Sequence, residues 1–262
     1  MEPRPTTRWP VERVDGVLLD IDDTLVDTRR AFVRALEVLA ARYLPHLGAD
    51  STPRLAARWL TDPGGHYGRY LSGELDYRAQ RMVRANDLHA TFGGPPLDED
   101  AYAAWEALFE TTVAAALTLH PDVPGLMAGL TDAGLPVGAV TNADVAAQTD
   151  KLVAVGLPGL PVLVGVDTLG VGKPDPRVFA EACRRLGTDP ARTVYVGDEL
   201  HLDAVAARAA GLVAVWLDRP GGRRVPVPDA DIAAADVAVV HTLADLPAVV
   251  ARAPTTTVRA SA

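Results

Sequence analysis

Short runs of consecutive apolar residues alternate along most of the chain with segments whose apolar residues recur at helical spacing. The runs cover residues 17–19, 136–140, 162–166, 193–196, 212–217 and 237–240. Continuous apolar runs of this length are typical of parallel strands that are buried on both faces. Their alternation with helices predicts right-handed crossovers. We therefore predict an α/β fold, a doubly wound parallel sheet built from residues 14–28 and 118–252.

The interval between the first two runs has a different pattern. Apolar residues recur at helical spacing over 32–43, where Pro45 ends the pattern, and again over 102–117. Between them, a Gly64-Gly65 pair precedes a segment of helical character over about 66–90. No strand pattern interrupts this interval. It predicts a second, smaller, all-helical domain over residues 29–117. The ends, 1–13 and 253–262, lack apolar periodicity and are predicted to be flexible tails.

Composition and charge argue against several classes of partner. Hydrophobic residues make up 48% of the 262-residue chain, and the formal net charge is −9. The sequence has no cluster of basic residues of the kind that contacts nucleic acid, so we expect no nucleic-acid partner. The longest uncharged stretch is interrupted by prolines and is too short to span a bilayer, so we expect no membrane association.

Cysteine usage and the first residues suggest a compartment. Cys183 is the single cysteine, which excludes an intramolecular disulfide and a cysteine-based zinc cluster. The first residues are charged and Pro-rich, unlike a signal peptide. We therefore expect a cytoplasmic protein.

Polar residues follow several of the predicted strands. Asp20 ends the first, Thr141-Asn142 the second, and Gly197-Asp198 a later one, while Lys173 follows the run at 162–166. In open α/β sheets, ligands bind beyond the carboxyl ends of the strands. We expect these residues to meet at one crevice, where carboxylates suit Mg²⁺ and an ammonium suits a phosphate.

Each motif also has a plain structural interpretation. Asp20-x-Asp22-x-Thr24 also fits an aspartate-rich turn, and Asp203 also fits a helix cap. Thr141 and Asn142 also fit the cap of a helix that begins near residue 143, which would equally present backbone N–H groups to an anion.

The chain has two lysines, Lys151 and Lys173, among 25 basic residues. Lys173 therefore stands out, because its rarity suggests a position where a compact ammonium fits and a guanidinium does not. Lys151 lies in the middle of a predicted helix, and we expect it on the protein surface.

The order of these motifs resembles the haloacid dehalogenase-like (HAD) hydrolase superfamily. The motifs Asp20-x-Asp22-x-Thr24, Thr141-Asn142, Lys173-Pro174 and Gly197-Asp198 with Asp203 occur in the family's order, and the resemblance covers about residues 14–250. It implies a three-layered core with a helical cap inserted between the first and second motifs.

The resemblance also implies roles for these residues. Asp20 is expected to be the nucleophile that forms an aspartyl-phosphate, and Asp22 the general acid and base. Asp20, the backbone carbonyl of Asp22, and Asp198 are expected to hold Mg²⁺, with Asp203 in support. Phosphoryl oxygens are expected to bind Thr141, Asn142 and Lys173. Phosphoryl transfer depends mainly on such positioning and charge neutralisation.

Other residues receive secondary expectations. The cap is expected to select the substrate through residues after Gly65, namely His66, Tyr67, Arg69 and Tyr70, although these also fit ordinary cap surface or core positions. Asp27 is expected to be structural and His201 to face solvent. Asp23 departs from the glycine of many family members.

The leading functional prediction is a Mg²⁺-dependent phosphatase, a phosphoric monoester hydrolase that acts on a small phosphorylated metabolite. A phosphomutase shares the same core and stays an alternative. A dehalogenase is less favoured, since such enzymes lack the second carboxylate, which is present here as Asp22. A non-enzymatic phosphate-binding protein would be expected to lack at least one of four site residues, and all four are present: Asp20, Asp22, Lys173 and Asp198. The sequence leaves the substrate, the pathway and the oligomeric state open.

Overall fold

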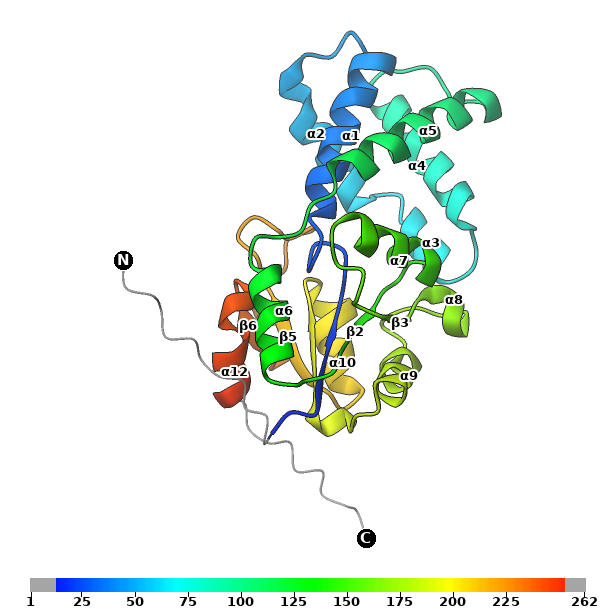
Figure 1. The fold of residues 1–262 in the computed structure, drawn as a ribbon. Coiled ribbons are helices and arrows are strands. Elements are labelled where there is room, and N and C mark those ends of the chain that lie inside the picture. Colours follow the sequence, from blue (N-terminus) through cyan, green and yellow to red (C-terminus); the bar gives the residue numbers. More distant parts are fainter. Residues whose placement is uncertain (1–12, 253–262) are drawn as a thin grey trace. The chain divides into compact units, whose positions relative to one another are not determined.

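The computed structural model describes residues 13–252 (Figure 1). The predicted tails lie outside this range except for Arg13, whose guanidinium donates a hydrogen bond to the Ala251 carbonyl at 2.7 Å. The described residues form two compact units. One, here called the sheet unit, comprises the residues up to Val26 and those from Leu119 onward, and the other, the helical unit, is Asp27–Thr118.

A parallel six-stranded sheet organises the sheet unit, with the order β3-β2-β1-β4-β5-β6. The strands are β1 (Gly16–Leu19), β2 (Val137–Val140), β3 (Val162–Val164), β4 (Thr193–Gly197), β5 (Val213–Leu217) and β6 (Ala238–Val240). All neighbouring strands are parallel. Every residue of β1 and β4 is buried, as expected of strands covered on both faces. The predicted α/β fold class is confirmed.

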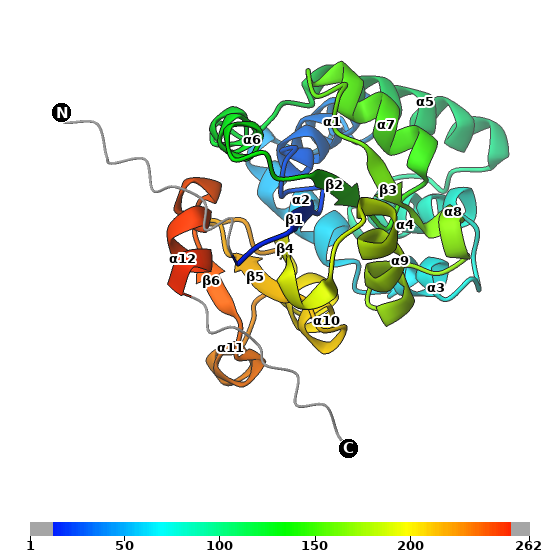
Figure 2. The same cartoon turned by 60° about the horizontal axis from the view of Figure 1, so that its bottom comes forward.

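Helices cover both faces of this sheet, with α9 and α10 on one side and α6 and α12 on the other (Figure 2). The helical segments are α6 (Val123–Asp132), α7 (Val145–Ala154), α8 (Val166–Leu169), α9 (Pro176–Leu186), η2 (Pro190–Arg192), the π-helical η3 (Leu200–Val205), α10 (Ala206–Ala209), α11 (Asp229–Ala235), η4 (Leu243–Asp245) and α12 (Leu246–Arg252). Helix α9 begins at Pro176 with Asp175 as its N-cap, whose side chain accepts from the Arg177 N–H. In the described part of the chain, no helix is both long and apolar enough to cross a membrane.

The strand order places a topological switch point at β1. After β1 the chain builds β2 and β3 on one side, then returns to build β4, β5 and β6 on the other. Leu19, the last residue of β1, pairs with Ala139 of β2 and Val196 of β4. The residues that follow these three strands therefore emerge side by side, which is where ligands bind in open α/β sheets.

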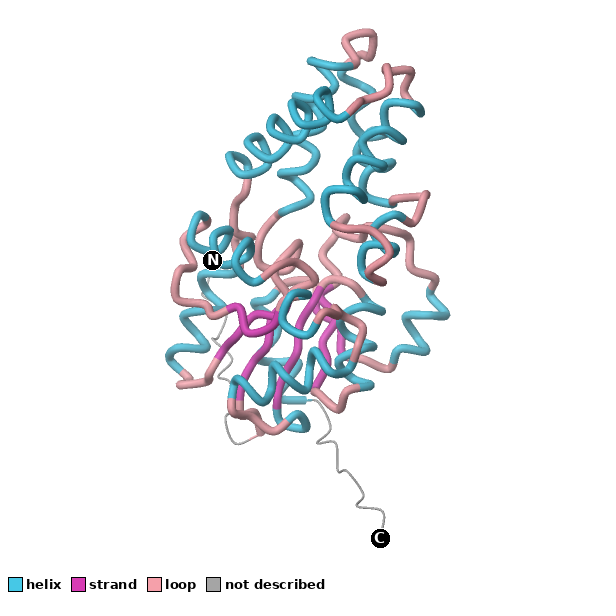
Figure 3. The backbone as a smooth tube through the Cα atoms, turned by 90° about the vertical axis from the view of Figure 1, so that its right-hand side faces the viewer, coloured by secondary structure: helices cyan, strands magenta, loops and turns pink. Residues whose placement is uncertain are grey.

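The helical unit, described throughout, contains helices and loops but no strand (Figure 3). Its helices are α1 (Thr28–Tyr43), η1 (Ala49–Ser51), α2 (Thr52–Thr61), α3 (His66–Leu71), α4 (Tyr77–Thr91) and α5 (Glu99–Ala116). The predicted helical segment over 66–90 is divided into α3 and α4. The break contains Gly73, whose φ of 77° lies in the left-handed region that glycine adopts without a steric penalty.

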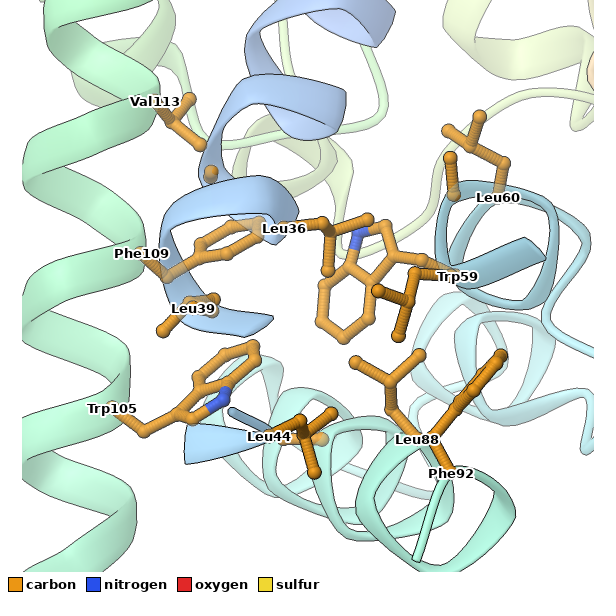
Figure 4. Packing of buried hydrophobic residues seen from close by; sticks show 14 of the residues in the cluster. Leu36, Leu39, Leu44, Trp59, Leu60, Leu88, Phe92, Trp105, Phe109 and Val113 are labelled. Atoms are coloured by element: carbon orange, nitrogen blue, oxygen red, sulfur yellow. The ribbon is translucent and has the colours of Figure 1, made fainter. Parts of the chain in front are cut away.

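Aromatic and aliphatic side chains together form the core of the helical unit (Figure 4). The rings of Trp105 and Phe109 are stacked, with centroids 5.3 Å apart, and Trp59 packs 5.2 Å from Phe109. Leu36 and Leu39 of α1 belong to the same buried cluster. The two apolar stripes predicted over 32–43 and 102–117 thus form one core.

Candidate active site

The loop after β1 presents two of the predicted carboxylates. The Asp20 N–H donates to the Val196 carbonyl at 2.9 Å, so Asp20 continues the line of the strand. The loop then turns, because the Leu25 and Val26 N–H groups both donate to the Ile21 carbonyl. Asp23 has a φ of 61°, a conformation that glycine adopts freely and that aspartate tolerates better than most residues. This explains how aspartate can replace the glycine of many family members.

Arg219 braces the same loop from the segment after β5. Its guanidinium forms a two-bond ion pair with the Asp122 carboxylate at 2.8 and 2.9 Å, and it also donates to the Thr24 carbonyl at 3.0 Å. Asp122 in turn accepts from the Thr242 hydroxyl and the Leu243 N–H. The loop is therefore fixed to two other parts of the sheet unit.

A buried lysine joins the carboxylates. Lys173 Nζ lies 2.6 Å from Asp20 Oδ1, 2.7 Å from Asp203 Oδ1 and 3.1 Å from the Tyr195 hydroxyl. The Tyr195 hydroxyl donates to Asp203 Oδ1 at 2.9 Å, and Asp203 Oδ2 accepts from the Glu199 N–H. All three donor bonds of the ammonium are thus made within the site.

Asn142 fixes the backbone of Lys173. Its Nδ2 donates to the Lys173 carbonyl at 2.9 Å, and its Oδ1 accepts from the Lys173 N–H at 2.6 Å. Gly172 permits this approach, since a Cβ there would lie 2.5 Å from Asn142 Oδ1. Gly197 has a similar part, because a Cβ there would lie 2.3 Å from Asp203 Cγ. Both glycines are required by close packing around the site.

Asp198 completes an acidic cluster. Its carbonyl accepts from Trp216 Nε1 at 2.8 Å, and its Oδ1 lies 3.4 Å from the Thr24 hydroxyl. Carboxylate oxygens of Asp20, Asp198 and Asp203 all lie within 4.8 Å of one another. Hard oxygen donors at this spacing suit a divalent cation such as Mg²⁺.

The electrostatics of the cluster agree with a cation site. Burial, opposed by Lys173, raises the pKa of Asp20 to about 7. Burial and the neighbouring charges of Asp20 and Asp23 raise the pKa of Asp198 well above its usual value. For Lys173, burial alone would lower the pKa, but the carboxylates of Asp20 and Asp203 outweigh it and raise the pKa. Three carboxylates with one ammonium leave an excess negative charge that a divalent cation would balance.

Asp22 is held by helix α7. Lys151 Nζ lies 2.6 Å from Asp22 Oδ1, and Gln148 Nε2 donates to Asp22 Oδ2 at 2.6 Å. Lys151, which was expected on the surface, is only partly exposed: its side chain is 19% exposed and ion-paired with Asp22. The helical pattern around Lys151 was correct, but a pattern along one helix does not reveal which distant loop the helix packs against.

Three further expectations concern local structure. Helix α7 begins at Val145, later than expected, with Asp144 as its N-cap, so Thr141 and Asn142 do not cap it. The Thr141 side chain is buried, and its hydroxyl accepts from the Ala143 N–H at 3.2 Å. Asp27 caps α1 by accepting from the Arg30 N–H, which confirms its structural role, and His201 is exposed as expected.

The predicted substrate-selecting residues belong to the helical unit and lie on α3. Tyr67 and Tyr70 are half-buried, with ring centroids 5.9 Å apart. Arg69 forms an ion pair with Glu74 at 2.7 Å. Their part in substrate selection stays a prediction, as does that of His66.

Sequence reasoning missed several supporting residues. Tyr195 and Trp216 could have been found from the sequence, because a phenol or an indole in a buried strand usually needs a hydrogen-bond partner. Nothing in the sequence pointed to Gln148, since a glutamine on a helix is usually exposed.

Comparisons with known proteins agree with the geometry. The family model of haloacid dehalogenase-like hydrolases matches residues 14–211. The chain belongs to this family. The prediction made from its motifs is confirmed.

Two relatives are named as phosphatases. The chain is 31% identical over 208 residues to a glyceraldehyde 3-phosphate phosphatase of Methanopyrus kandleri, covering 79% of this chain and 84% of the relative. It is 32% identical over 212 residues to a plasmid-encoded phosphoglycolate phosphatase of Cupriavidus necator. This match covers 79% of this chain and 84% of the relative. These names agree with the predicted phosphoric monoester hydrolase.

Solved structures share the fold. The HAD-hydrolase YfnB from Bacillus subtilis has a TM-score of 0.68 at 22% identity, covering 91% of this chain and 99% of that one. The L-2-haloacid dehalogenase PA0810 has a TM-score of 0.68 at 26% identity, covering 92% of this chain and 100% of that one.

The raised pKa values predict that the metal-free protein loses stability as pH rises. Between about pH 4 and 7 the folded state retains the Asp20 proton that the unfolded state releases, so the free energy of unfolding falls across this range. The thermal midpoint in excess chelator should therefore drop more between pH 5 and pH 7.5 in the wild type than in Asp20→Asn. Equal drops in the two proteins would contradict the raised pKa.

Proposed function

We propose that this protein is a Mg²⁺-dependent phosphatase that hydrolyses a small phosphomonoester through an aspartyl-phosphate on Asp20. The observation that carries the proposal is the pairing of two carboxylates. Asp20 is buried within the acidic cluster, and Asp22, two residues later, is 27% exposed on its side chain. The phosphatase names of the relatives support the same chemistry.

The reaction follows from the roles of these two carboxylates. An oxygen of Asp20 attacks phosphorus, and the bond from phosphorus to the ester oxygen breaks as the new bond forms. Asp22, protonated at this stage, gives its proton to the leaving oxygen. The resulting Asp22 carboxylate then takes a proton from water as that water attacks the phosphoenzyme. Inorganic phosphate leaves, and both side chains return to their starting protonation states.

The residues of the cluster fit Mg²⁺. Carboxylates of Asp20 and Asp198 and the backbone carbonyl of Asp22 would hold the ion. Asp203 has a supporting role, since its oxygens accept from Lys173, Tyr195 and the Glu199 N–H. Mg²⁺, when bound, supplies positive charge that lowers the repulsion between these carboxylates and the phosphate.

Phosphoryl oxygens would be bound by groups after β2 and by Lys173. The Thr141 hydroxyl accepts from the Ala143 N–H, which leaves its proton to donate to a phosphoryl oxygen. Asn142 contributes through its backbone and by fixing Lys173, since its side-chain amide is engaged with that residue. Lys173 neutralises charge on the phosphate. The helical unit would act as the cap, with Tyr67, Arg69 and Tyr70 reading the rest of the substrate.

The likeness to a dehalogenase structure raises a second chemistry, which Asp22 argues against. A halide leaves without a proton, so a dehalogenase needs no general acid, whereas an alkoxide leaving group does. A phosphomutase uses the same two carboxylates but returns the phosphoryl group to an organic acceptor. It is therefore distinguished by its product.

A panel of small phosphorylated metabolites tests the proposal. The purified protein with Mg²⁺ is expected to release inorganic phosphate from at least one of them, followed by ³¹P NMR. Transfer of the phosphoryl group within the substrate would identify a mutase instead. Release of halide from 2-haloacids with no phosphate release from any ester would overturn the proposal.

Metal removal should abolish the activity. The excess negative charge of the cluster would repel a phosphate dianion, so excess chelator is expected to stop phosphate release and added Mg²⁺ to restore it. Asp198→Asn should raise the Mg²⁺ concentration needed for half-maximal rate. Unchanged turnover in excess chelator would contradict the metal assignment.

A further inference from the structure

Two side chains of α7 converge on Asp22. Gln148 and Lys151 are three residues apart, a spacing that places side chains on the same face of a helix. Each donates to a different oxygen of the Asp22 carboxylate, both at 2.6 Å. Every carboxylate oxygen can accept more than one hydrogen bond, so these two contacts do not use up the hydrogen-bonding capacity of Asp22. Two donors from one helix restrict the carboxylate to a single orientation.

The burial of Gln148 is difficult to explain by stability. The residue is 2% exposed, and its Oε1 has no hydrogen-bond partner among the described residues. A buried polar atom without a partner costs about 1–3 kcal/mol. Methionine has a similar volume and would fill the site without that cost. The donation from Nε2 to Asp22 is the contact that a methionine would lose.

Both lysines of the chain form ion pairs with carboxylates of the loop after β1. The chain has two lysines among its 25 basic residues. Lys173 binds Asp20 and Lys151 binds Asp22, so each carboxylate of Asp20-Ile21-Asp22 has one ammonium partner. An ammonium is compact and can approach one oxygen, whereas a planar guanidinium favours a two-bond contact. At Asp22 the second oxygen is bound by Gln148 instead.

We propose that Gln148 and Lys151 are positioning residues that orient the ionised Asp22 carboxylate to take a proton from the attacking water in the second half of the reaction. This inference rests on the proposed function, because it assigns the pair a task only if Asp22 is the general acid and base. A freely rotating Asp22 would spend most of its time away from the attacking water. Misplacement of a catalytic group by about 1 Å can cost up to about 10²-fold in rate.

The main test uses Gln148→Met. The variant removes the unpartnered oxygen, so its thermal midpoint should equal or exceed that of the wild type, yet its kcat should fall by about 10-fold to 10²-fold. With p-nitrophenyl phosphate, whose leaving group needs little protonation, rapid mixing should show a burst of nitrophenolate followed by a slower steady rate. Lys151→Met should show the same burst. Asp150→Asn, an exposed change on the same helix, is the matched control and should behave as the wild type.

Combination with Asp22→Asn separates positioning from general damage. If the pair acts through Asp22, adding Gln148→Met or Lys151→Met to Asp22→Asn should cause little further loss. A full additional loss in the double variants, or wild-type kinetics in both single variants, would overturn the inference. A wild-type protein that releases no phosphate from any ester would instead overturn the proposed function, which distinguishes the two failures.

Discussion

Asp20→Asn is expected to abolish phosphate release from every substrate. The amide cannot attack phosphorus as the carboxylate does, so no phosphoenzyme can form. We expect a loss on the order of 10⁴-fold or more, as for other covalent nucleophiles. Steady-state phosphate release and intact-protein mass spectrometry after an acid quench would measure both effects.

The fold should survive this change. Lys173 keeps its 2.7 Å contact with Asp203, and the loss of one buried carboxylate relieves repulsion within the cluster. In chelator near neutral pH, the thermal midpoint of Asp20→Asn should therefore be no lower than that of the wild type. Phosphoenzyme in this variant would show that the nucleophile is another residue.

Asp22→Asn should produce a different defect. With an alkyl phosphate, the leaving alkoxide needs a proton, so the first step should slow by about 10² to 10⁴-fold. With p-nitrophenyl phosphate the first step should proceed, while hydrolysis of the aspartyl-phosphate lacks its general base. The variant should therefore accumulate one phosphoryl group per chain, and peptide mapping should place it on Asp20.

A neighbouring carboxylate provides the control for Asp22→Asn. Asp27→Asn removes a charge near the same loop, but asparagine caps helices as well as aspartate does, so α1 and the activity should be retained. A phosphoryl group on Asp22 or on a histidine would contradict the assignment. Equal losses on alkyl and aryl esters would argue against a general-acid role for Asp22.

The sheet and the strand-end residues could be predicted because they depend on local patterns. The apolar runs gave all six strands, and the polar residue after each of β1, β2 and β4 identified Asp20, Thr141 and Asp198. Parallel strands bring their carboxyl ends to one edge, so their meeting required no knowledge of packing. Lys173 was found through its rarity in an arginine-rich chain.

Contacts made between distant segments could not be predicted. The donors to Asp22 lie more than a hundred residues further along the chain, on a helix whose rotation about its axis is set by packing against the sheet. Lys151 is as rare in this chain as Lys173. Because Lys151 lies within a helix, however, its side chain was expected to be exposed to solvent. The sequence also did not show that the Asn142 side chain fixes the Lys173 backbone, whereas its predicted part in substrate binding stays a prediction.

The pairing of both lysines with loop carboxylates has a practical consequence for chemical labelling. Amine-directed reagents normally modify many surface lysines and leave an active site unaffected. In this chain the two lysine side chains are 19% and 5% exposed, and each is ion-paired with Asp22 or Asp20. Acylation of either lysine would therefore remove the ammonium partner of a carboxylate in this loop, and dyes or supports are better attached through an introduced surface cysteine than through amines.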